Sequence, residues 1–521
     1  MNTTVKQRIG YDLSANGIVN TVYRGKVELN SFHEATYEET DAAIKKAAIA
    51  FPLYGGMNGN QRAAFLETIA KHIAATGDAL IGVTRQETGL PEARLQAERQ
   101  RTISQLQLFA GLLKDGSWIK AIIDTGFNDP IKPDTRQMQV PLGVAAVFGA
   151  SNFPYAFSVA GGDTVSALAA GCTVVHKANP AHPVTAEVMA GCILRAAKDT
   201  RMPDGVFSLL HGAAHKLGAD LVMHPLVKAV GFTGSFKGGM ALFDMAMKRS
   251  EPIPVFAEMG SVNPVFILPA MLRQQGNSIA WKLAASNTLG VGQFCTNPGL
   301  FIIVRSEETD RFIKDYVESI QKIAGQPMLS DNICNAYFES AVHLEGTPGV
   351  EVLTILTEND NSNIALPQVF KVSGDDFLNS KTLQEEVFGP SSLIVVAENR
   401  TQLMAIAEYL TGQLTASVWA TQADCLEYAP LFIGLQYKAG RIIYNDVPTG
   451  VEVNHSMVHG GPHPATTDSR TTSVGTQAIY RFTRPVCFQD FPNSLLPDAL
   501  RNENRSGTWR QVNGSMNNMS I

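Results

Sequence analysis

The sequence predicts an α/β protein built on parallel β-sheets. Short apolar runs alternate with stretches in which apolar residues recur at helical spacing, which is the pattern of βαβ units. Apolar residues make up 45% of the chain and charged residues only 17%, so large buried cores are expected instead of disorder. The length of 521 residues suggests about two to four domains.

The first part of the chain is expected to be mainly helical. Residues 1–35 suggest an irregular or hairpin-like entry. A helical layer ahead of the first sheet is then predicted over residues 38–51, 61–76, 78–87 and 91–113. Residues 119–139 break the helical pattern with Pro130 and Pro133, and we expect an extended arm there.

Two sets of alternating strands and helices follow. In the first set, strands are predicted at 144–148, 173–177, 206–210, 227–232 and 254–258, and helices at 158–170, 184–198, 213–223 and 237–249. In the second set, strands are predicted at 300–304, 393–397, 416–420 and 441–444, with helices such as 310–324 and 401–410 between them. Residues 478–488 are interpreted as a final strand, and the tail from Pro492 as partly disordered or wrapped on the surface.

Charge and cysteine content exclude several classes of partner. The net charge of −6 and the lack of a polybasic run do not indicate a positively charged surface that would bind nucleic acid or a membrane. The N-terminus has no apolar signal core, and no apolar run approaches membrane-spanning length. The six cysteines form no CxxC pair or metal-like spacing, so no metal site is expected, and a reducing cytoplasm fits best.

Residues 288–300 (TLGVGQFCTNPGL) contain the best candidate for a nucleophile. Cys295 lies there among small and polar residues, and Gly290, Gly292 and Pro298 deny the segment a regular helix. A single cysteine usually behaves as a small buried hydrophobe. The loop context favours a reactive thiol instead.

Two further stretches supply partners for such a thiol. The run 255–257 ends in Glu258, which places a carboxylate at the carboxyl end of a predicted strand, where open α/β sheets carry active-site residues. A salt-bridged strand-end glutamate is the alternative. Asn152 follows another apolar run in FGASNFP. Together the three side chains would provide a nucleophile, a base and an oxyanion donor.

At this point the sequence resembles a known family. SNFP, HKANP, GFTGS, EMG, GQFCTNPG and EEVFGP occur in the order and spacing of the aldehyde dehydrogenase superfamily, over about residues 140–390. Longer stretches such as AEMGSVNPVF and VPTGVEVNHSMVHGG resemble one bacterial branch. That branch contains 2-oxoglutarate semialdehyde (2,5-dioxopentanoate) dehydrogenases and NADP-linked fatty aldehyde dehydrogenases.

The resemblance implies a fold with three parts. These are a Rossmann-type parallel-sheet domain for NAD(P) (residues 1–118 and 140–258), a second α/β domain for catalysis (259–463), and a small β oligomerisation arm (119–139 and 478–490). Residues 491–521 would form a C-terminal tail. Arm strands need pairing partners, so a homodimer or homotetramer is expected.

The resemblance also assigns the chemistry. Cys295 would attack the aldehyde as thiolate, and its own N–H and the Asn152 amide would hold the oxyanion. Glu258 would activate water to hydrolyse the resulting thioester. Alternatives are a CoA-acylating enzyme, whose relatives tend to lack the glutamate, and a non-catalytic binding protein.

The resemblance implies a cofactor site at several motifs. Gly234 and Ser235 would lie along the pyrophosphate and Lys177 on the adenosine ribose, with Glu386 and Phe388 placing the nicotinamide ribose and ring. Pro180 stands where NAD-selective members often have a glutamate that repels a 2′-phosphate, so NADP is permitted. Either NADP or NAD is expected.

Three residues are assigned to the substrate. Counting along the family places Arg101, Phe157 and His459 near positions that line the substrate tunnel. An arginine there would meet a carboxylate, which favours 2-oxoglutarate semialdehyde over a long-chain aldehyde. Alternatively, Arg101 pairs with Glu98 or faces solvent, and His459 and its neighbour His455 are structural or surface residues.

Overall fold

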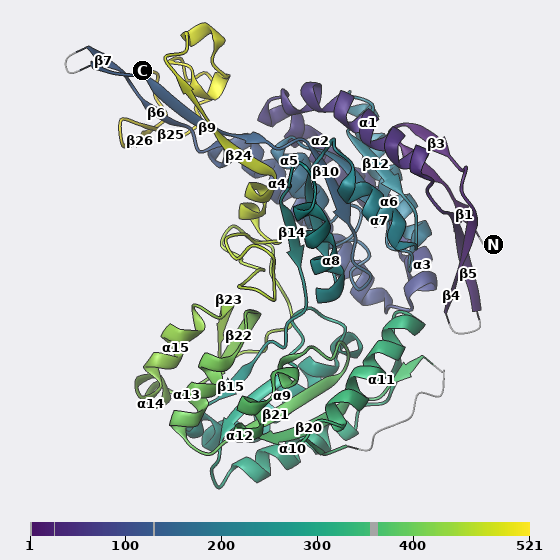
Figure 1. The fold of residues 1–521 in the computed structure, drawn as a ribbon, viewed down its shortest axis with the longest axis vertical. Helices are drawn as coiled ribbons and strands as arrows, with labels where there is room; N and C mark the ends of the chain where they lie inside the picture. The colour runs from purple at the N-terminus through teal and green to yellow at the C-terminus, as the bar shows by residue number, and fades with distance from the viewer. Residues whose placement is uncertain (1–2, 25–26, 129–130, 355–362) are drawn as a thin grey trace.

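A computed structural model describes residues 3–24, 27–128, 131–354 and 363–521 of the chain. Figure 1 shows two lobes, each built around a β-sheet, with an arm that extends from the first lobe and carries the C-terminus. The expected α/β class is therefore confirmed. Of the two prolines used to place the arm, Pro130 lies outside the described residues.

The sheet of the first lobe is parallel apart from one edge. Its spatial order is β14-β13-β10-β11-β12-β2-β3, and β2 runs antiparallel to both of its neighbours, β12 and β3. The strands are β10 (Val144–Phe148), β11 (Thr173–Lys177), β12 (Phe207–Leu210), β13 (Val227–Thr233), β14 (Val255–Glu258), β2 (Gln7–Ile9) and β3 (Asp12–Ser14). Strand order reverses between β10 and β13, and ligands bind at the carboxyl ends of strands at such a switch point.

Helices cover both faces of this sheet because its strands are apolar on both sides. In β10, Ala145 and Val147 pack with the layer of α2 to α6, whereas Val144, Ala146 and Phe148 pack with α1, α7 and α8. The helices are α1 (Tyr37–Gly55), α2 (Gly59–Ala75), α3 (Gly77–Thr88), α4 (Glu92–Asp115), α5 (Gly162–Ala170), α6 (Pro183–Asp199), α7 (His215–Met223) and α8 (Phe236–Met247).

The second lobe holds a sheet of order β18-β20-β21-β16-β15-β22-β23, parallel except for β18. Its strands are β15 (Val265–Ile267), β16 (Leu300–Val304), β18 (Glu351–Val352), β20 (Gln368–Ser373), β21 (Ser391–Ala397), β22 (Gln413–Trp419) and β23 (Ala439–Tyr444). Its helices are α9 (Pro269–Thr288), α10 (Thr309–Gln321), α11 (Asp331–Glu345), α12 (Gly374–Asn379), α13 (Arg400–Tyr409), α14 (Gln422–Glu427) and α15 (Ala429–Leu435). A small antiparallel pair joins β17 (Gln326–Pro327) to β19 (Ile364–Ala365). The sequence reading missed the short strand β15 and the strand β20.

The arm is a five-stranded sheet of order β24-β9-β6-β25-β26, made from two distant parts of the chain. Its strands are β6 (Ile122–Asp124), β9 (Thr135–Pro141), β24 (Thr483–Gln489), β25 (Arg510–Val512) and β26 (Ser515–Asn517). The short strands β7 (Phe127–Asn128) and β8 (Ile131–Lys132) pair at its tip.

One expectation for the C-terminal region was wrong, and one of the two alternatives for the tail is confirmed. The segment expected as one strand over 478–488 begins as a 3-10 helix, η4 (Thr476–Phe482), because Ala478, Ile479 and Phe482 turn one face into the core beside α5. The tail is not disordered: β25 pairs with β6, and Leu496 and Leu500 are buried against the arm. The wrapping of the tail on the surface is what the structure shows.

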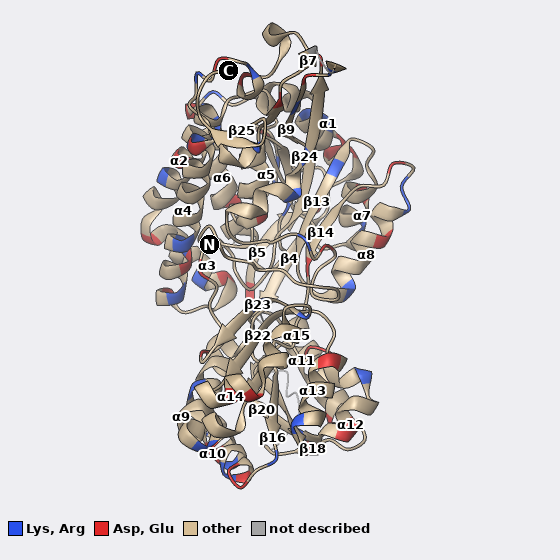
Figure 2. Ribbon diagram, turned by 90° about the vertical axis from the view of Figure 1, so that its left-hand side faces the viewer, with Lys and Arg blue, Asp and Glu red and all other residues tan. Residues whose placement is uncertain are grey.

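The N-terminal segment forms a hairpin, as expected. β4 (Val19–Arg24) and β5 (Val27–His33) pair antiparallel, and β1 (Thr4–Val5) adds to the side of β5. Figure 2 shows basic and acidic residues mixed over the outer helices of both lobes, without a face of one sign in that view. None of the helices in the described part of the chain is long and apolar enough to cross a membrane.

Candidate active site

The loop of Cys295 is held in place by its glycines and by one asparagine. It follows the short 3-10 helix η2 (Leu289–Gly292), in which Gly290 and Gly292 take positive φ angles of 58° and 64°. The Asn263 amide Nδ2 donates to the carbonyls of Cys295 at 2.9 Å and Asn297 at 2.8 Å. The position of the thiol is therefore fixed through the backbone of its own turn.

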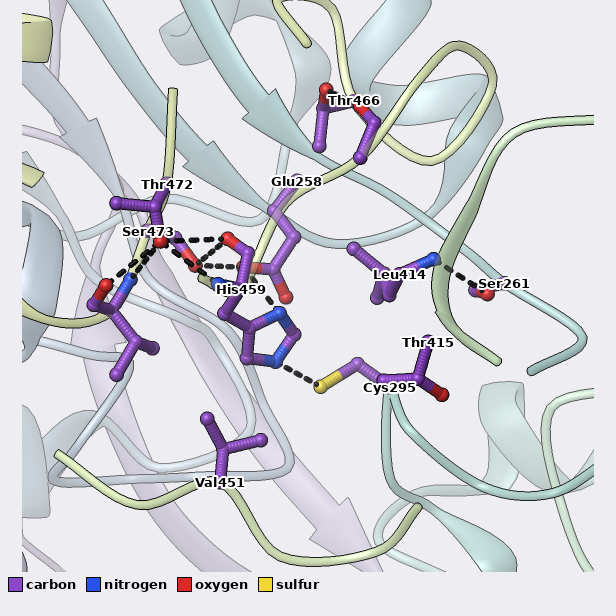
Figure 3. A network of polar contacts seen from close by, with 12 residues as sticks. Glu258, Ser261, Cys295, Leu414, Thr415, Val451, His459, Thr466, Thr472 and Ser473 are labelled. Carbon is purple, nitrogen blue, oxygen red and sulfur yellow. Dashed lines mark hydrogen bonds and ion pairs between the residues drawn. The ribbon is translucent and has the colours of Figure 1, made fainter. Parts of the chain in front are cut away.

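Glu258 and His459 meet at this thiol. Glu258 ends β14, and its Oε2 lies 3.4 Å from Nδ1 of His459. The other ring nitrogen, Nε2, lies 3.2 Å from the Cys295 sulfur, so the imidazole stands between carboxylate and thiol (Figure 3). The hydroxyl of Ser473 donates to Glu258 Oε2 and to the His459 carbonyl. The sequence analysis placed His459 on the substrate path, and the structure brings it against both catalytic candidates.

Burial sets the protonation of these groups. It raises the pKa of Glu258 to about 7, helped by the charge of Asp163 and opposed by the Ser473 hydrogen bond. Burial also raises the pKa of Cys295 well above its usual value, and the charge of Glu258 adds to this. For His459, burial lowers the pKa to about 3, since a charged ring would be desolvated. At neutral pH the site therefore holds a thiol, a neutral imidazole and a partly ionised carboxyl group.

Asn152 lies beside the cysteine loop. It follows β10, is nearly buried, and its amide Nδ2 donates to the carbonyl of Gln293 at 3.1 Å. A side-chain amide has two N–H groups, so a second donor remains for an oxyanion. Arg94 holds the Asn152 backbone in turn, because its Nη2 donates to the Asn152 carbonyl at 2.6 Å.

The three residues assigned to the substrate lie together. The rings of Phe157 and His459 are 6.1 Å apart in an edge-to-face arrangement, and the Arg101 guanidinium lies 5.1 Å from the Phe157 ring centre. Arg101 Nη2 donates to the Val451 carbonyl at 3.3 Å, while Nη1 is buried without a hydrogen-bond partner among the described residues. Arg101 therefore does not face solvent.

The neighbouring acid is engaged elsewhere. Glu98 Oε1 accepts from the backbone N–H groups of Tyr155 and Ala156, at 2.8 and 3.0 Å. Its charge still acts on Arg101 from a distance. The hydrogen bonds of Arg101 and Glu98 thus go to backbone groups.

Several residues of the site escaped the sequence analysis. Ser473 and Arg441 stand in stretches without any local signal, and only the fold brings them to the site. Arg441 lies on β23 and donates to the carbonyls of Gly450 (2.8 Å) and Pro448. Asn263 could have been found, because it follows Glu258 within the EMGSVNP stretch and asparagine tolerates positive φ, here 48°.

The N-terminus of α8 offers a place for phosphate groups. Gly234 and Ser235 are exposed there, after β13, and the Ser235 hydroxyl caps the helix by accepting from the Gly238 N–H at 3.2 Å. A Cβ added at Gly234 would lie 2.7 Å from the Phe232 ring, so any larger residue would require that ring to shift. Exposed N–H groups at a helix N-terminus suit a pyrophosphate.

The other cofactor candidates also lie where a dinucleotide could reach them. Lys177 ends β11 at the same sheet edge, and burial lowers its pKa to about 8. Glu386 and Phe388 line one pocket together with Gly292 and Asn297 of the cysteine loop. The Glu386 carboxylate packs directly against Gly260, where a Cβ would be only 2.2 Å from its Oε2. The donor set and the glycine cradle therefore fit NAD(P).

Comparison with known proteins decides the family. The model of the aldehyde dehydrogenase family matches residues 23–484. The chain belongs to the aldehyde dehydrogenase family. It is 45% identical over 487 residues to an alpha-ketoglutaric semialdehyde dehydrogenase of Acinetobacter baylyi, covering 93% of this chain and 92% of the relative. It is 47% identical over 476 residues to alpha-ketoglutaric semialdehyde dehydrogenase 2 of Azospirillum brasilense, covering 91% of each.

Solved structures share the fold of this aldehyde dehydrogenase. A 1-pyrroline-5-carboxylate dehydrogenase from Thermus with bound NAD superposes with a TM-score of 0.80 at 19% identity, covering 94% of this chain and 93% of that one. Betaine aldehyde dehydrogenase of Staphylococcus aureus in complex with NAD+ gives a TM-score of 0.80 at 19% identity, covering 94% and 96%. The family and its branch, expected from the motifs, are confirmed, and the protein is an NAD(P)-dependent oxidoreductase that acts on aldehydes.

Proposed function

We propose that the enzyme oxidises 2-oxoglutarate semialdehyde to 2-oxoglutarate. The observation that carries this substrate is a pair of guanidiniums, Arg101 and Arg441, beside the reactive thiol. Both donate to carbonyls of the same segment, residues 448–451, and both interact electrostatically with Cys295 and His459. Two half-buried guanidiniums beside the thiol can bind an anion with charge-assisted hydrogen bonds, and the semialdehyde carries a carboxylate at its far end.

The reaction begins at Cys295. Its sulfur bonds to the aldehyde carbon, and the thiol proton passes to Glu258, whose pKa of about 7 makes it a better base for a thiol than His459 with a pKa of about 3. Glu258 releases this proton to solvent before it acts again. The neutral His459 ring positions the sulfur through the contact of 3.2 Å at Nε2. The oxyanion is held by Asn152 and by the Cys295 N–H, which makes no other backbone hydrogen bond in the described part of the chain.

When bound, NAD(P) would supply the hydride acceptor for the oxidation step, and the residues that would hold it are Gly234, Ser235, Lys177, Glu386 and Phe388. The protein then carries a thioester on Cys295. Glu258 takes a proton from a water molecule, whose oxygen attacks the thioester carbon and frees the thiol. A carboxyl group with a pKa of about 7 suits this task at neutral pH.

The substrate proposal is tested on the two arginines. Arg101→Met and Arg441→Met should each raise KM for the semialdehyde acid by roughly tenfold or more, because a charge-assisted hydrogen bond is lost. Their kcat/KM for the uncharged aldehyde hexanal should barely change. Arg99→Met is the matched control, since Arg99 on the same helix donates to the Gly77 carbonyl instead.

Equal losses on both aldehydes would contradict a carboxylate site. The competing long-chain fatty aldehyde function predicts that hexanal and longer aldehydes outperform the semialdehyde acid in the wild type. Added CoA should not change the rate, since Glu258 is in place to direct water at the thioester.

We further propose that the enzyme works as a homodimer or homotetramer in the cytoplasm. The edge strands of the arm sheet present backbone N–H and C=O groups that can pair with a strand of another subunit, which supports assembly into an oligomer. Free thiols at Cys172, Cys192, Cys295, Cys425 and Cys487 are consistent with a reducing compartment. Light scattering of the full chain gives the subunit number, and a monomer at micromolar concentration would refute the assembly.

A further inference from the structure

The catalytic cluster also has the composition of a metal site. One ligand atom each from Cys295, Glu258 and His459 lies within 4.8 Å of the other two. Thiolate sulfur, imidazole nitrogen and carboxylate oxygen are the three ligand types that Zn²⁺ takes in proteins. Three protein ligands and one open position are the usual arrangement of an accessible zinc site.

The separations need little adjustment for an ion. The Cys295 sulfur and Nε2 of His459 are 3.2 Å apart. In a tetrahedral zinc site with bonds of about 2.3 Å to sulfur and 2.0 Å to nitrogen, these two atoms would be about 3.5 Å apart. The sulfur and Nε2 therefore need to move little. The Glu258 carboxylate lies on the Nδ1 side of the ring in Figure 3, and it must turn toward Nε2 to complete the site, from a ligand atom already within 4.8 Å of the other two.

Burial leaves polar atoms of this cluster unsatisfied. The side chains of His459 and Glu258 are only 1% and 3% exposed. Glu258 Oε1 has no hydrogen-bond partner among the described residues. A buried carboxylate oxygen without a donor is unfavourable, and a cation bound there would satisfy it.

Hydrogen bonds from neighbouring residues hold the three ligand residues in place. The Ser473 hydroxyl donates to Glu258, and the backbone N–H of Ser473 donates to the His459 carbonyl at 2.8 Å. The Asn263 side chain donates to the Cys295 carbonyl. Such outer contacts orient metal ligands. Arg101 and Arg441 act against a cation by like charge, and the two anionic ligands offset them.

We propose that Cys295, Glu258 and His459 bind a thiophilic divalent cation, with Zn²⁺ as the best fit, and that its binding reversibly inactivates the enzyme. Binding forms metal–sulfur, metal–nitrogen and metal–oxygen bonds and releases the thiol proton to solvent, without any change of oxidation state. The occupied sulfur cannot attack an aldehyde, and the occupied carboxylate cannot activate water. Mg²⁺ and Ca²⁺ prefer oxygen ligands and are excluded.

The test uses the full-length enzyme, reduced and freed of metal with a chelator. Zn²⁺ binding is measured directly by calorimetry, and Cd²⁺ binding by the ultraviolet absorbance of the metal–thiolate bond. One ion per subunit is expected, with loss of activity at the same stoichiometry, recovery on adding EDTA, and no effect of Mg²⁺. The binding measurement needs no aldehyde, so its outcome is independent of the substrate proposal.

Variants locate the ion. His459→Phe and Glu258→Gln should each weaken Zn²⁺ binding by roughly 100-fold, since a direct ligand is lost. Cys487→Ser removes an exposed thiol on the arm and should change neither metal affinity nor basal activity. The proposal is overturned if both His459→Phe and Glu258→Gln keep wild-type affinity, if Cys487→Ser abolishes inhibition, or if EDTA fails to restore activity.

Discussion

The polar groups around Cys295 and those at the N-terminus of α8 are held in opposite ways. Around the thiol, the working atoms belong to buried or half-buried side chains. They are held by hydrogen bonds from neighbours such as Ser473, which binds the Glu258 carboxylate, and Asn263, which binds the Cys295 backbone. At α8, the working atoms are backbone N–H groups on an exposed turn, and glycine provides access. Bond-making needs side-chain atoms at set distances, whereas the pyrophosphate of a dinucleotide needs backbone donors and space. Substitutions should therefore have much larger effects around the thiol.

The largest effect is expected from Cys295→Ala. Turnover should fall by roughly 10⁴-fold or more, because no other group can form the covalent intermediate. NAD(P) affinity, measured by fluorescence titration, should stay within about twofold, since the thiol contributes little to the dinucleotide site. Near-normal oxidation by this variant would refute the mechanism.

Glu258→Gln should separate the two half-reactions. We expect a burst of about one NAD(P)H per active site, somewhat slowed, followed by a steady state reduced by roughly 10²- to 10³-fold. Stopped-flow absorbance measures both phases. If the burst disappeared together with the steady state, Glu258 would serve mainly to activate the thiol.

The pH dependence should follow from the burial of Glu258. Its raised pKa of about 7 means that the carboxylate form, which accepts the proton from water, is lost as pH falls through 7. Thioester hydrolysis in single-turnover experiments should rise tenfold per pH unit well below 7 and level off above it. His459, with a pKa near 3, contributes no change in this range. A hydrolysis rate independent of pH between 5 and 8 would contradict this assignment.

The smallest effect is expected on the cofactor side. Pro180 lies half-buried in the turn between β11 and α6, and Pro180→Glu should shift the ratio of kcat/KM values toward NAD by about tenfold through repulsion of a 2′-phosphate. The wild type should accept NADP. An unchanged ratio would mean that the adenosine ribose binds elsewhere.

Local periodicity was enough to predict much of the fold. The strands β10, β11 and β16 begin and end at the predicted residues, because each is a short apolar run between clear breaks. Tertiary packing decided what local periodicity predicted wrongly or left open. The segment η4 is helical because its apolar face meets α5, and the tail wraps on the surface because the arm buries Leu496 and Leu500.

The sequence by itself determined the alternation of strands and helices, and with it the sheet edge at which Asn152, Lys177 and Glu258 would lie. It also placed Cys295 in a loop that glycines keep irregular. Only the tertiary structure decided that His459 stands between Glu258 and Cys295, and that Ser473 and Arg441 join the site. The physical reason is separation along the chain: backbone preferences act between near neighbours, whereas these contacts join residues more than a hundred positions apart, which meet only when the two lobes pack.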